Sequence, residues 1–205
     1  MNFSAKQIIN SSATKLWWIR NHGDNKDMNQ FTEARELGSK FQKQVAQSLL
    51  LGEYEEEMGG FVTVYETGDR IYFSNDVVLD NGHAIIECKY PMFGYTEDFL
   101  NKSILQCAFY SFLSDQCTIL KKAKFACPEG VEPKQIKLDD NFKYLLAFGD
   151  QMFEIKVTNH NLIWEWCKQK ICNSINYSDA KAYNESHPQK YQYEMLKDSF
   201  KVFKI

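Results

Sequence analysis

The feature that most constrains the fold is the segment SNDVVLDNGHAIIECKY, residues 74–90, in which two short apolar runs flank the dipeptide Asn81-Gly82. Asn-Gly between two such runs is the strongest short-range indication of a β-hairpin with a two-residue turn. Counting outward from this turn places Val78 opposite Ile85. The chain is therefore expected to contain an antiparallel strand pair whose register is set locally.

The same register brings charged side chains together inside this apolar hairpin. Asp76 would lie opposite Glu87, and Lys89 would share the face of Glu87 because side chains alternate along a strand. Directly opposed like charges destabilise a strand pair, so a cation is expected between the two carboxylates. Lys89 is one candidate, and a divalent ion that prefers oxygen ligands, Mg²⁺ or Mn²⁺, is the other.

An exposed hairpin face, on which these charges simply meet water, would explain the same residues. The apolar neighbours on both sides of the charges argue against this alternative, since strands that are apolar on both faces are typical of the centre of a sheet. Burying a carboxylate without a partner is unfavourable, so its presence there indicates a site.

The remaining sequence predicts a succession of short elements in a single domain, residues 1–205, without repeats or linkers. A hydrophobic content of 44% and an aromatic content of 15% suit one compact core. Helices are expected over about 4–20, 32–51, 96–114 and 159–173, with another in the C-terminal tail. Strands are expected over about 61–67, 70–79, 83–90, 117–126, 143–149 and 151–158, with a second two-residue turn at Gly68-Asp69. This order predicts an α/β (α+β) fold, a central mixed sheet flanked by helices.

Charge and cysteine usage exclude several classes of protein. The net charge is −3, so contact with nucleic acid would need a local basic patch instead of a basic coat. The N-terminal segment does not resemble a secretory signal, and no run of about eighteen apolar residues could span a membrane. The six cysteines lack the spacing of a disulfide scaffold, which indicates reduced thiols in a cytoplasmic protein.

A second constellation lies in the predicted helix DFLNKSILQCAFYSFL. Gln106 and Tyr110 are four residues apart and so lie on one helix stripe, with Lys102 one turn before them. A helix edge on which the glutamine meets solvent and the tyrosine covers the core would show the same spacing. The pattern gains weight because it follows shortly after the strand that carries Glu87 and Lys89.

In this order, Asp76, Glu87-Cys88-Lys89 and Gln106-x-x-x-Tyr110 resemble the PD-(D/E)XK nuclease superfamily. The last element resembles the RecB-type branch, which includes CRISPR-adaptation exonucleases and relatives of lambda exonuclease. The resemblance covers about residues 31–115 and implies a restriction-endonuclease-like core with the catalytic residues on the second and third strands.

The resemblance implies a metal-dependent deoxyribonuclease that hydrolyses phosphodiester bonds. An exonuclease is expected, acting on single- or double-stranded DNA ends in recombination, repair, or phage and mobile-element DNA processing. An endonuclease of the restriction or junction-resolving type remains an alternative. So does a catalytically inactive member that binds nucleic acid or protein. Some such exonucleases form rings, which leaves a homo-oligomer open.

The resemblance also implies a ligand set. Asp76, Glu87 and the backbone carbonyl of Cys88 would hold one or two Mg²⁺ or Mn²⁺ ions, which lower the pKa of an attacking water. Lys89 would orient that water and offset charge developing on the phosphate.

Further residues are expected around the substrate. Gln106 and Tyr110 would position the substrate or the catalytic lysine. Lys102 would contact a neighbouring phosphate, and Arg35, on the helix before the strands, is a further substrate-binding candidate.

The sequence departs from the branch at two positions. The branch usually carries Gly-x-x-x-His on the helix before the strands, and here Gly38 is followed by Gln42, a poorer metal ligand than histidine. Gly38 is expected to permit close approach of helix and sheet. Asn75 stands where the motif name has proline. No iron–sulfur cluster is expected, because the first helix lacks the cysteine that cluster-bearing members have there.

Overall fold

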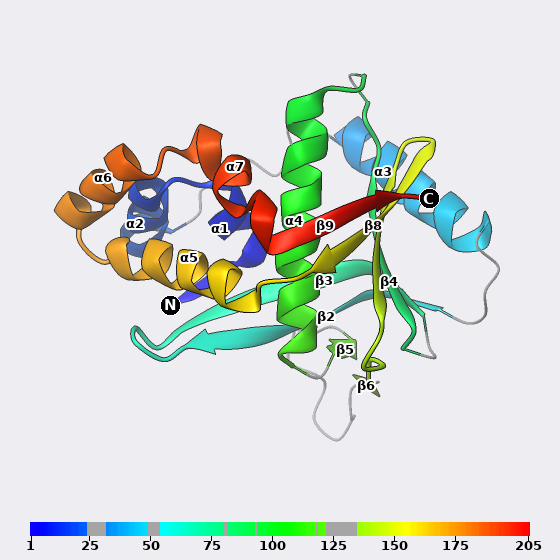
Figure 1. Cartoon of the computed structure of the whole chain (residues 1–205), viewed down its shortest axis with the longest axis horizontal. Coiled ribbons are helices and arrows are strands. Elements are labelled where there is room, and N and C mark those ends of the chain that lie inside the picture. The colour runs from blue at the N-terminus through cyan, green and yellow to red at the C-terminus, as the bar shows by residue number, and fades with distance from the viewer. Residues whose placement is uncertain (24–31, 49–53, 80–81, 93, 118, 122–134) are drawn as a thin grey trace.

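The protein folds around one large mixed sheet, and the computed structural model describes residues 1–23, 32–48, 54–79, 82–92, 94–117, 119–121 and 135–205 (Figure 1). Its strands are β1 (Asn2–Ser4), β2 (Tyr54–Val64), β3 (Asp69–Leu79), β4 (Ala84–Lys89), β5 (Ile119–Lys121), β6 (Gln135–Ile136), β7 (Lys143–Phe148), β8 (Gln151–Val157) and β9 (Phe200–Lys204). Its helices are α1 (Ala5–Asn10), α2 (Ala13–His22), α3 (Thr32–Ser48), α4 (Glu97–Asp115), α5 (His160–Asn173), α6 (Tyr177–Ser186) and α7 (Gln192–Leu196).

The described strands form one sheet in the order β6-β5-β2-β3-β4-β7-β8-β9, with β1 beside β3. The β1–β3 and β4–β7 pairs are parallel, and the other pairs are antiparallel. A mixed sheet flanked by helices confirms the predicted α+β class.

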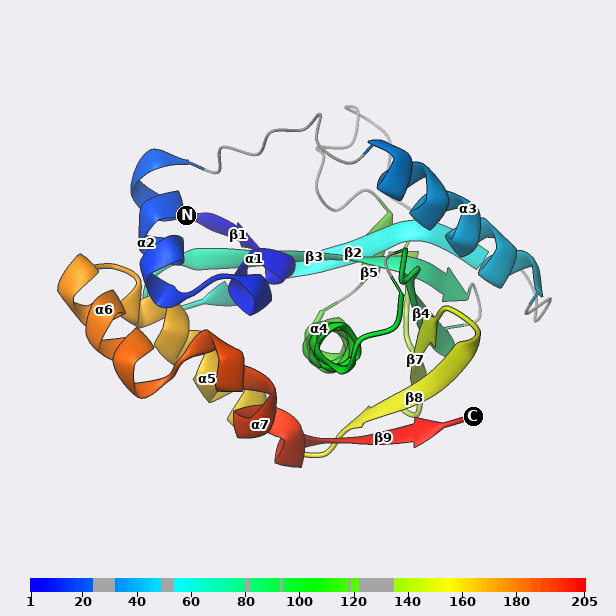
Figure 2. The same ribbon diagram turned by 90° about the horizontal axis from the view of Figure 1, so that it is seen from above.

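Helix α4 runs along the inner side of the curved sheet. Figure 2 shows it end-on, with β2 and β3 on one side, β8 and β9 on the other, and β4 and β7 between them. Its side chains are buried almost all round from Leu100 to Ser114, because sheet surrounds it on several sides. Helix α3 covers the opposite face of the sheet, where Val45 and Ala46 pack on Val77 and Ile86.

The first helix was predicted as one element, and this prediction was wrong. Ser4 does cap a helix, in a capping box with Gln7, but that helix ends at Asn10. Ser12 then caps α2 by accepting from Lys15 N. Residues Asn2–Ser4 form β1 because they pair with β3. No pattern in the local sequence predicts this contact.

The β2–β3 hairpin was also predicted too short. β2 begins at Tyr54, and it continues through Gly59, where a Cβ would lie 2.0 Å from the Phe73 carbonyl oxygen. Glycine therefore marks a close backbone approach here and not the end of a strand. The turn is not the two-residue Gly68-Asp69 turn but four residues, 65–68, closed by Gly68 N donating to Val64 O, with φ +68° at Gly68.

The C-terminal half follows the prediction more closely. α4, α5, β7 and β8 lie where they were expected, within one or two residues. The strand predicted over 117–126 is described only as β5, and 122–134 lie outside the described residues. β6 was missed, as was β9, which extends the sheet by pairing with β8. In the part of the chain that the structure describes, no helix is long and apolar enough to cross a membrane.

Candidate active site

The β3–β4 hairpin has the predicted register next to its turn, but the pairing ends at Val77 and Ile86, so the predicted pairing of Asp76 with Glu87 is not formed. Val78 pairs with Ile85 and Val77 with Ile86, and all four side chains are buried. The predicted turn falls partly outside the described residues, at 80–81. This central strand pair carries Asp76, Glu87 and Lys89, as the sequence indicated.

The alternation of side chains along β3 slips by one residue at Asp76. Asn75 bonds to α4, and Phe73 packs on Tyr110 of that helix, so both face α4. A regular strand would turn Val77 to the same face, yet Val77 packs against α3. A local irregularity of the backbone therefore coincides with the candidate catalytic aspartate.

The polar atoms of Asp76 are held by both neighbouring elements. Its backbone carbonyl accepts from Gln42 Nε2 of α3 at 2.8 Å. Its carboxylate Oδ2 accepts from the backbone N–H of Cys88 on β4 at 2.8 Å. The aspartate carboxylate thus lies against the main chain of the strand that carries Glu87.

Glu87 is the most enclosed charged group of this cluster. Its side chain is 2% exposed, and Oε1 accepts from Lys89 Nζ at 2.5 Å and from Gln106 Nε2 at 2.6 Å. Oε2 is buried and has no hydrogen-bond partner among the residues that the structure describes. Burial, and secondly the Asp76 charge, raise the pKa of Glu87 to about 7 against the opposing effect of Lys89.

Lys89 lies beside Glu87 on the α4 face and is 18% exposed. Burial alone would lower its pKa, but the Glu87 and Asp76 carboxylates together raise that pKa above its ordinary value. The ammonium form is therefore favoured at neutral pH. Lys89 can donate hydrogen bonds and balance negative charge, but it is not suited to accept a proton.

Gln106 and Tyr110 both project from α4 toward this cluster. Gln106 is 6% exposed and orients Glu87 through the bond to Oε1. Tyr110 is equally buried, and its ring lies 6.1 Å from that of Phe73. Burial, followed by the nearby Glu87 charge, raises the pKa of Tyr110. The helix stripe predicted from the spacing of these residues is thus brought to the charged strand.

Asn75, at the position of the proline in the motif, has a structural role. It is 1% exposed, accepts from Tyr144 Oη at 2.8 Å and donates to Ser114 Oγ at 3.2 Å. These bonds connect β3 to β7 and α4 directly beside Asp76. A proline could make neither side-chain bond.

Other predicted residues lie farther from the cluster or outside what is described. Lys102 is exposed and forms an ion pair with Asp98 one turn earlier on α4. Arg35 belongs to α3, but its side chain lies outside the described residues. The role predicted for Gly38 was wrong, because a Cβ there would meet no atom of the other described residues within 4 Å.

Lys6 is a residue that the sequence reasoning missed. β1 ends with Ser4 opposite Tyr72, and α1 begins along the stretch of β3 that leads to Asp76. The exposed Lys6 ammonium is close enough to Glu87 to oppose the rise in its pKa. No local signal could have placed it here, because its neighbour is more than 80 residues away in the chain.

The donor atoms suit a hard divalent cation. Within the described residues, no group of three or more His, Cys, Asp or Glu side chains is arranged around a common point. The available ligands are the Asp76 and Glu87 carboxylates and main-chain oxygens such as that of Cys88. Glu87 Oε2, buried without a partner, is the atom that a cation would satisfy, and oxygen donors are those preferred by Mg²⁺ and Mn²⁺.

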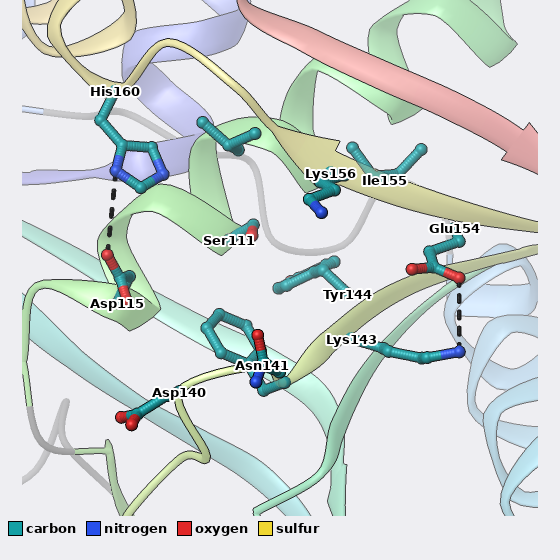
Figure 3. A pocket seen from close by; sticks show the side chains of 12 residues that line it. Ser111, Asp115, Asp140, Asn141, Lys143, Tyr144, Glu154, Ile155, Lys156 and His160 are labelled. Atoms are coloured by element: carbon teal, nitrogen blue, oxygen red, sulfur yellow. Dashed lines mark ion pairs between the residues drawn. The ribbon is translucent and has the colours of Figure 1, made fainter.

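A separate cavity of about 230 Å³ lies beyond the end of α4 and does not include this cluster (Figure 3). Two pairs of side chains lie close together in its lining: His160 is 3.9 Å from Asp115, and Lys143 is 3.6 Å from Glu154. Acidic and basic side chains, with Asp140 and Lys156 among them, are mixed around this cavity, and its lining does not include Asp76, Glu87 or Lys89.

Comparison with protein-family models finds no match to this chain, and no curated protein matches it either.

Proposed function

We propose that this protein is a metal-dependent DNA nuclease. The observation that carries the proposal is the environment of Glu87. This carboxylate is 2% exposed, and one of its oxygens lacks a partner within the described part of the chain. It lies in the same hairpin as Asp76 and in contact with Lys89. Such an arrangement is unfavourable for folding alone, and it supplies the oxygen ligands that phosphodiester hydrolysis with a divalent metal requires.

The metal would be Mg²⁺ or Mn²⁺, held by Asp76, Glu87 and the Cys88 backbone carbonyl. When bound, it supplies a Lewis acid that polarises the scissile phosphate and lowers the pKa of the attacking water. The protein's part is to fix the two carboxylates. Asp76 is held by the Cys88 N–H, and Glu87 is held by Gln106 and Lys89.

Lys89 has the second chemical role. Because the surrounding carboxylates raise its pKa, it stays protonated and can donate to the attacking water or to a phosphate oxygen. Tyr110 would act as a positioning residue for Lys89 or for the substrate. Its ring packing on Phe73 fixes its place on α4.

The resemblance favours an exonuclease acting on DNA ends, with an endonuclease as the alternative. The test is cleavage of end-labelled linear DNA and closed circular DNA of the same sequence with Mg²⁺ or Mn²⁺. Loss of linear but not circular DNA is expected of the exonuclease, whereas cutting of the circle would indicate the endonuclease.

The variant Asp76→Asn tests whether the carboxylates are the metal site. Asparagine keeps an oxygen that can accept from the Cys88 N–H but removes the charge next to Glu87. Cleavage should be lost while the metal-free protein stays as stable as the wild type or becomes more stable. Mn²⁺ should raise the melting temperature of the wild type and raise that of the variant far less.

The control is Asp198→Asn, which changes an exposed aspartate on a short 3₁₀ turn before β9. It should leave cleavage and metal response unchanged. Retention of full metal-dependent cleavage by Asp76→Asn, or a wild-type melting temperature that ignores saturating Mn²⁺, would refute the proposal. Absence of cleavage of any DNA or RNA would favour a binding protein of the same fold.

A further inference from the structure

The reacting groups of the proposed site are recessed. Glu87 is 2% exposed and Lys89 18%, while Gln106 and Tyr110 are each 6% exposed. Duplex DNA is stiff over many base pairs and presents its phosphates on a broad, regular surface. An unpaired strand can bend locally and bring one phosphodiester to a recessed carboxylate, so the burial favours a single strand.

An exposed aromatic side chain lies directly beside this recess. Lys89 pairs with Phe148 of β7, and paired residues of parallel strands point to the same face. The ring of Tyr95 contacts the Phe148 ring edge-on, with centroids 5.6 Å apart and planes at 84°. Tyr95 is nevertheless 53% exposed. One edge of its ring is anchored by the core, and the rest is available next to the catalytic lysine.

A second tyrosine borders the opposite side of the same strand end. Tyr90 follows Lys89 directly, packs at 5.7 Å on Phe41 of α3, and is 46% exposed. Short backbone bonds hold the connection between them: Met92 N donates to Tyr90 O, and Gly94 N donates to Pro91 O, each at 2.9 Å. The two rings are therefore anchored on either face of the sheet where β4 ends.

The chemistry of this connection suits bases and not phosphates. The segment YPMFGY, residues 90–95, contains no charged residue, whereas Lys89, directly before it, and Lys6 are cations close to Glu87. Aromatic side chains beside a cationic track are the means by which proteins bind unpaired nucleic acid, because every base has a face that can stack.

We propose that the substrate of this site is single-stranded nucleic acid, with Tyr95, assisted by Tyr90, stacking on unpaired bases next to the scissile phosphodiester. This inference rests on the proposed nuclease function and adds the substrate class to it. DNA and RNA share the unpaired base that the tyrosines would contact, so both are included in the test.

The first experiment compares cleavage by the full-length protein with Mn²⁺. The substrates are a labelled single strand of DNA, its blunt duplex, and the RNA strand of the same sequence. The single strand should be cut at least about tenfold faster than the duplex, given that stacking on one base alone changes affinity by about 5- to 150-fold. Equal or faster cutting of the blunt duplex would overturn the proposal. The RNA arm decides which single strand is preferred.

The second experiment changes the stacking side chain. Tyr95→Ala should lower kcat/KM on the single strand by about 5- to 150-fold, mainly through KM, and Tyr95→Phe should restore it. Tyr191→Ala is the matched control, because Tyr191 is 50% exposed but belongs to the short turn before α7, away from β4. Unchanged kinetics of Tyr95→Ala, with an unchanged melting temperature, would overturn the role of the tyrosine.

A binding measurement separates this inference from the nuclease proposal. Fluorescence anisotropy of the labelled single strand, with EDTA present to remove divalent ions, reports binding without cleavage. Weaker binding by Tyr95→Ala supports stacking even if the protein proves to cut nothing, which would refute only the nuclease function. Metal-dependent cleavage together with binding that ignores Tyr95 would keep the nuclease function and overturn this inference.

Discussion

Lys170 is a buried cation whose effect on stability can be worked out from its surroundings. The side chain is 2% exposed and its ammonium donates to Ile8 O at 2.7 Å, Gln192 Oε1 at 2.9 Å and Gln189 Oε1 at 3.0 Å. It also lies 5.0 Å from the ring centre of Trp166. All three acceptors are neutral, and burial lowers the pKa of Lys170 from 10.5 to about 7.

The sign of the pH dependence follows from this lowering. Between about pH 7 and pH 10.5 the unfolded chain holds a proton on Lys170 that the folded chain has released, so the free energy of unfolding rises with pH. At about 1.4 kcal/mol for each pKa unit, the free energy of unfolding rises by roughly 5 kcal/mol in total between about pH 7 and pH 10.5. Between about pH 7 and pH 8.5, the free energy of unfolding is expected to rise by roughly 1.5 kcal/mol.

The assay is urea unfolding of the wild type and Lys170→Met across this pH interval at constant ionic strength. Methionine fills similar space without titrating, and the carbonyls that it leaves unpaired lower stability at every pH alike. The free energy of unfolding of the wild type, relative to that of Lys170→Met, should therefore rise by roughly 1.5 kcal/mol from about pH 7 to pH 8.5. The contribution of Glu87, whose pKa is raised from 4.5 to about 7, falls mainly below pH 7, and what remains of its titration above pH 7 is common to both proteins and cancels in the difference.

Lys181→Met, at an exposed position of α6, is the control and should show no pH-dependent difference from the wild type. If the difference in the free energy of unfolding between the wild type and Lys170→Met stayed constant with pH, the reasoning would be refuted. It would mean that the three acceptors hold the ammonium as well as water does, so that burial does not lower the pKa.

Three further predictions concern the proposed site. Tyr110→Phe keeps the ring in place, so it should change the free energy of unfolding by less than about 1 kcal/mol while slowing cleavage; an unchanged rate would leave the tyrosine a packing residue. Gln42→His should tighten Mn²⁺ binding in calorimetry, because imidazole is the better donor and the residue already contacts the Asp76 backbone; unaltered affinity would remove it from the metal. If Lys6 contacts a phosphate, Lys6→Gln should raise KM and reduce the slope of the logarithm of the binding constant against the logarithm of the salt concentration by about one. Lys15→Gln on α2 should change neither quantity.

Local signals predicted the parts of the fold that depend on near neighbours. The Asn-Gly turn between apolar runs predicted the register of β3 and β4, because the alternatives would turn a buried set of side chains to water. Thr96 and the acidic residues after it predicted the start of α4. The threonine side chain accepts from Phe99 N, and negative charge is favourable at the N-terminus of a helix. The four-residue spacing of Gln106 and Tyr110 predicted that they share a helix stripe.

Where the prediction of the fold was wrong, a distant contact decided the outcome. The strand predicted over about 61–67 begins at Tyr54 and includes Gly59, where the backbone of Phe73 approaches closely. β1 and β9 are short segments that become strands only by pairing with β3 and β8. Propensity over a few residues cannot report such pairing, because its energy comes from chain segments far away in the sequence.

The residue types of the candidate site were thus readable in the sequence, together with the strand and helix that carry each of them. Only the tertiary structure decided their chemical state. The slip at Asp76, the unpartnered oxygen of Glu87 and the approach of Lys6 all depend on packing between α1, α3, α4 and the sheet. A charged group's pKa and its hydrogen bonds are set by everything within a few ångströms in space, and those neighbours come from segments that the sequence keeps apart.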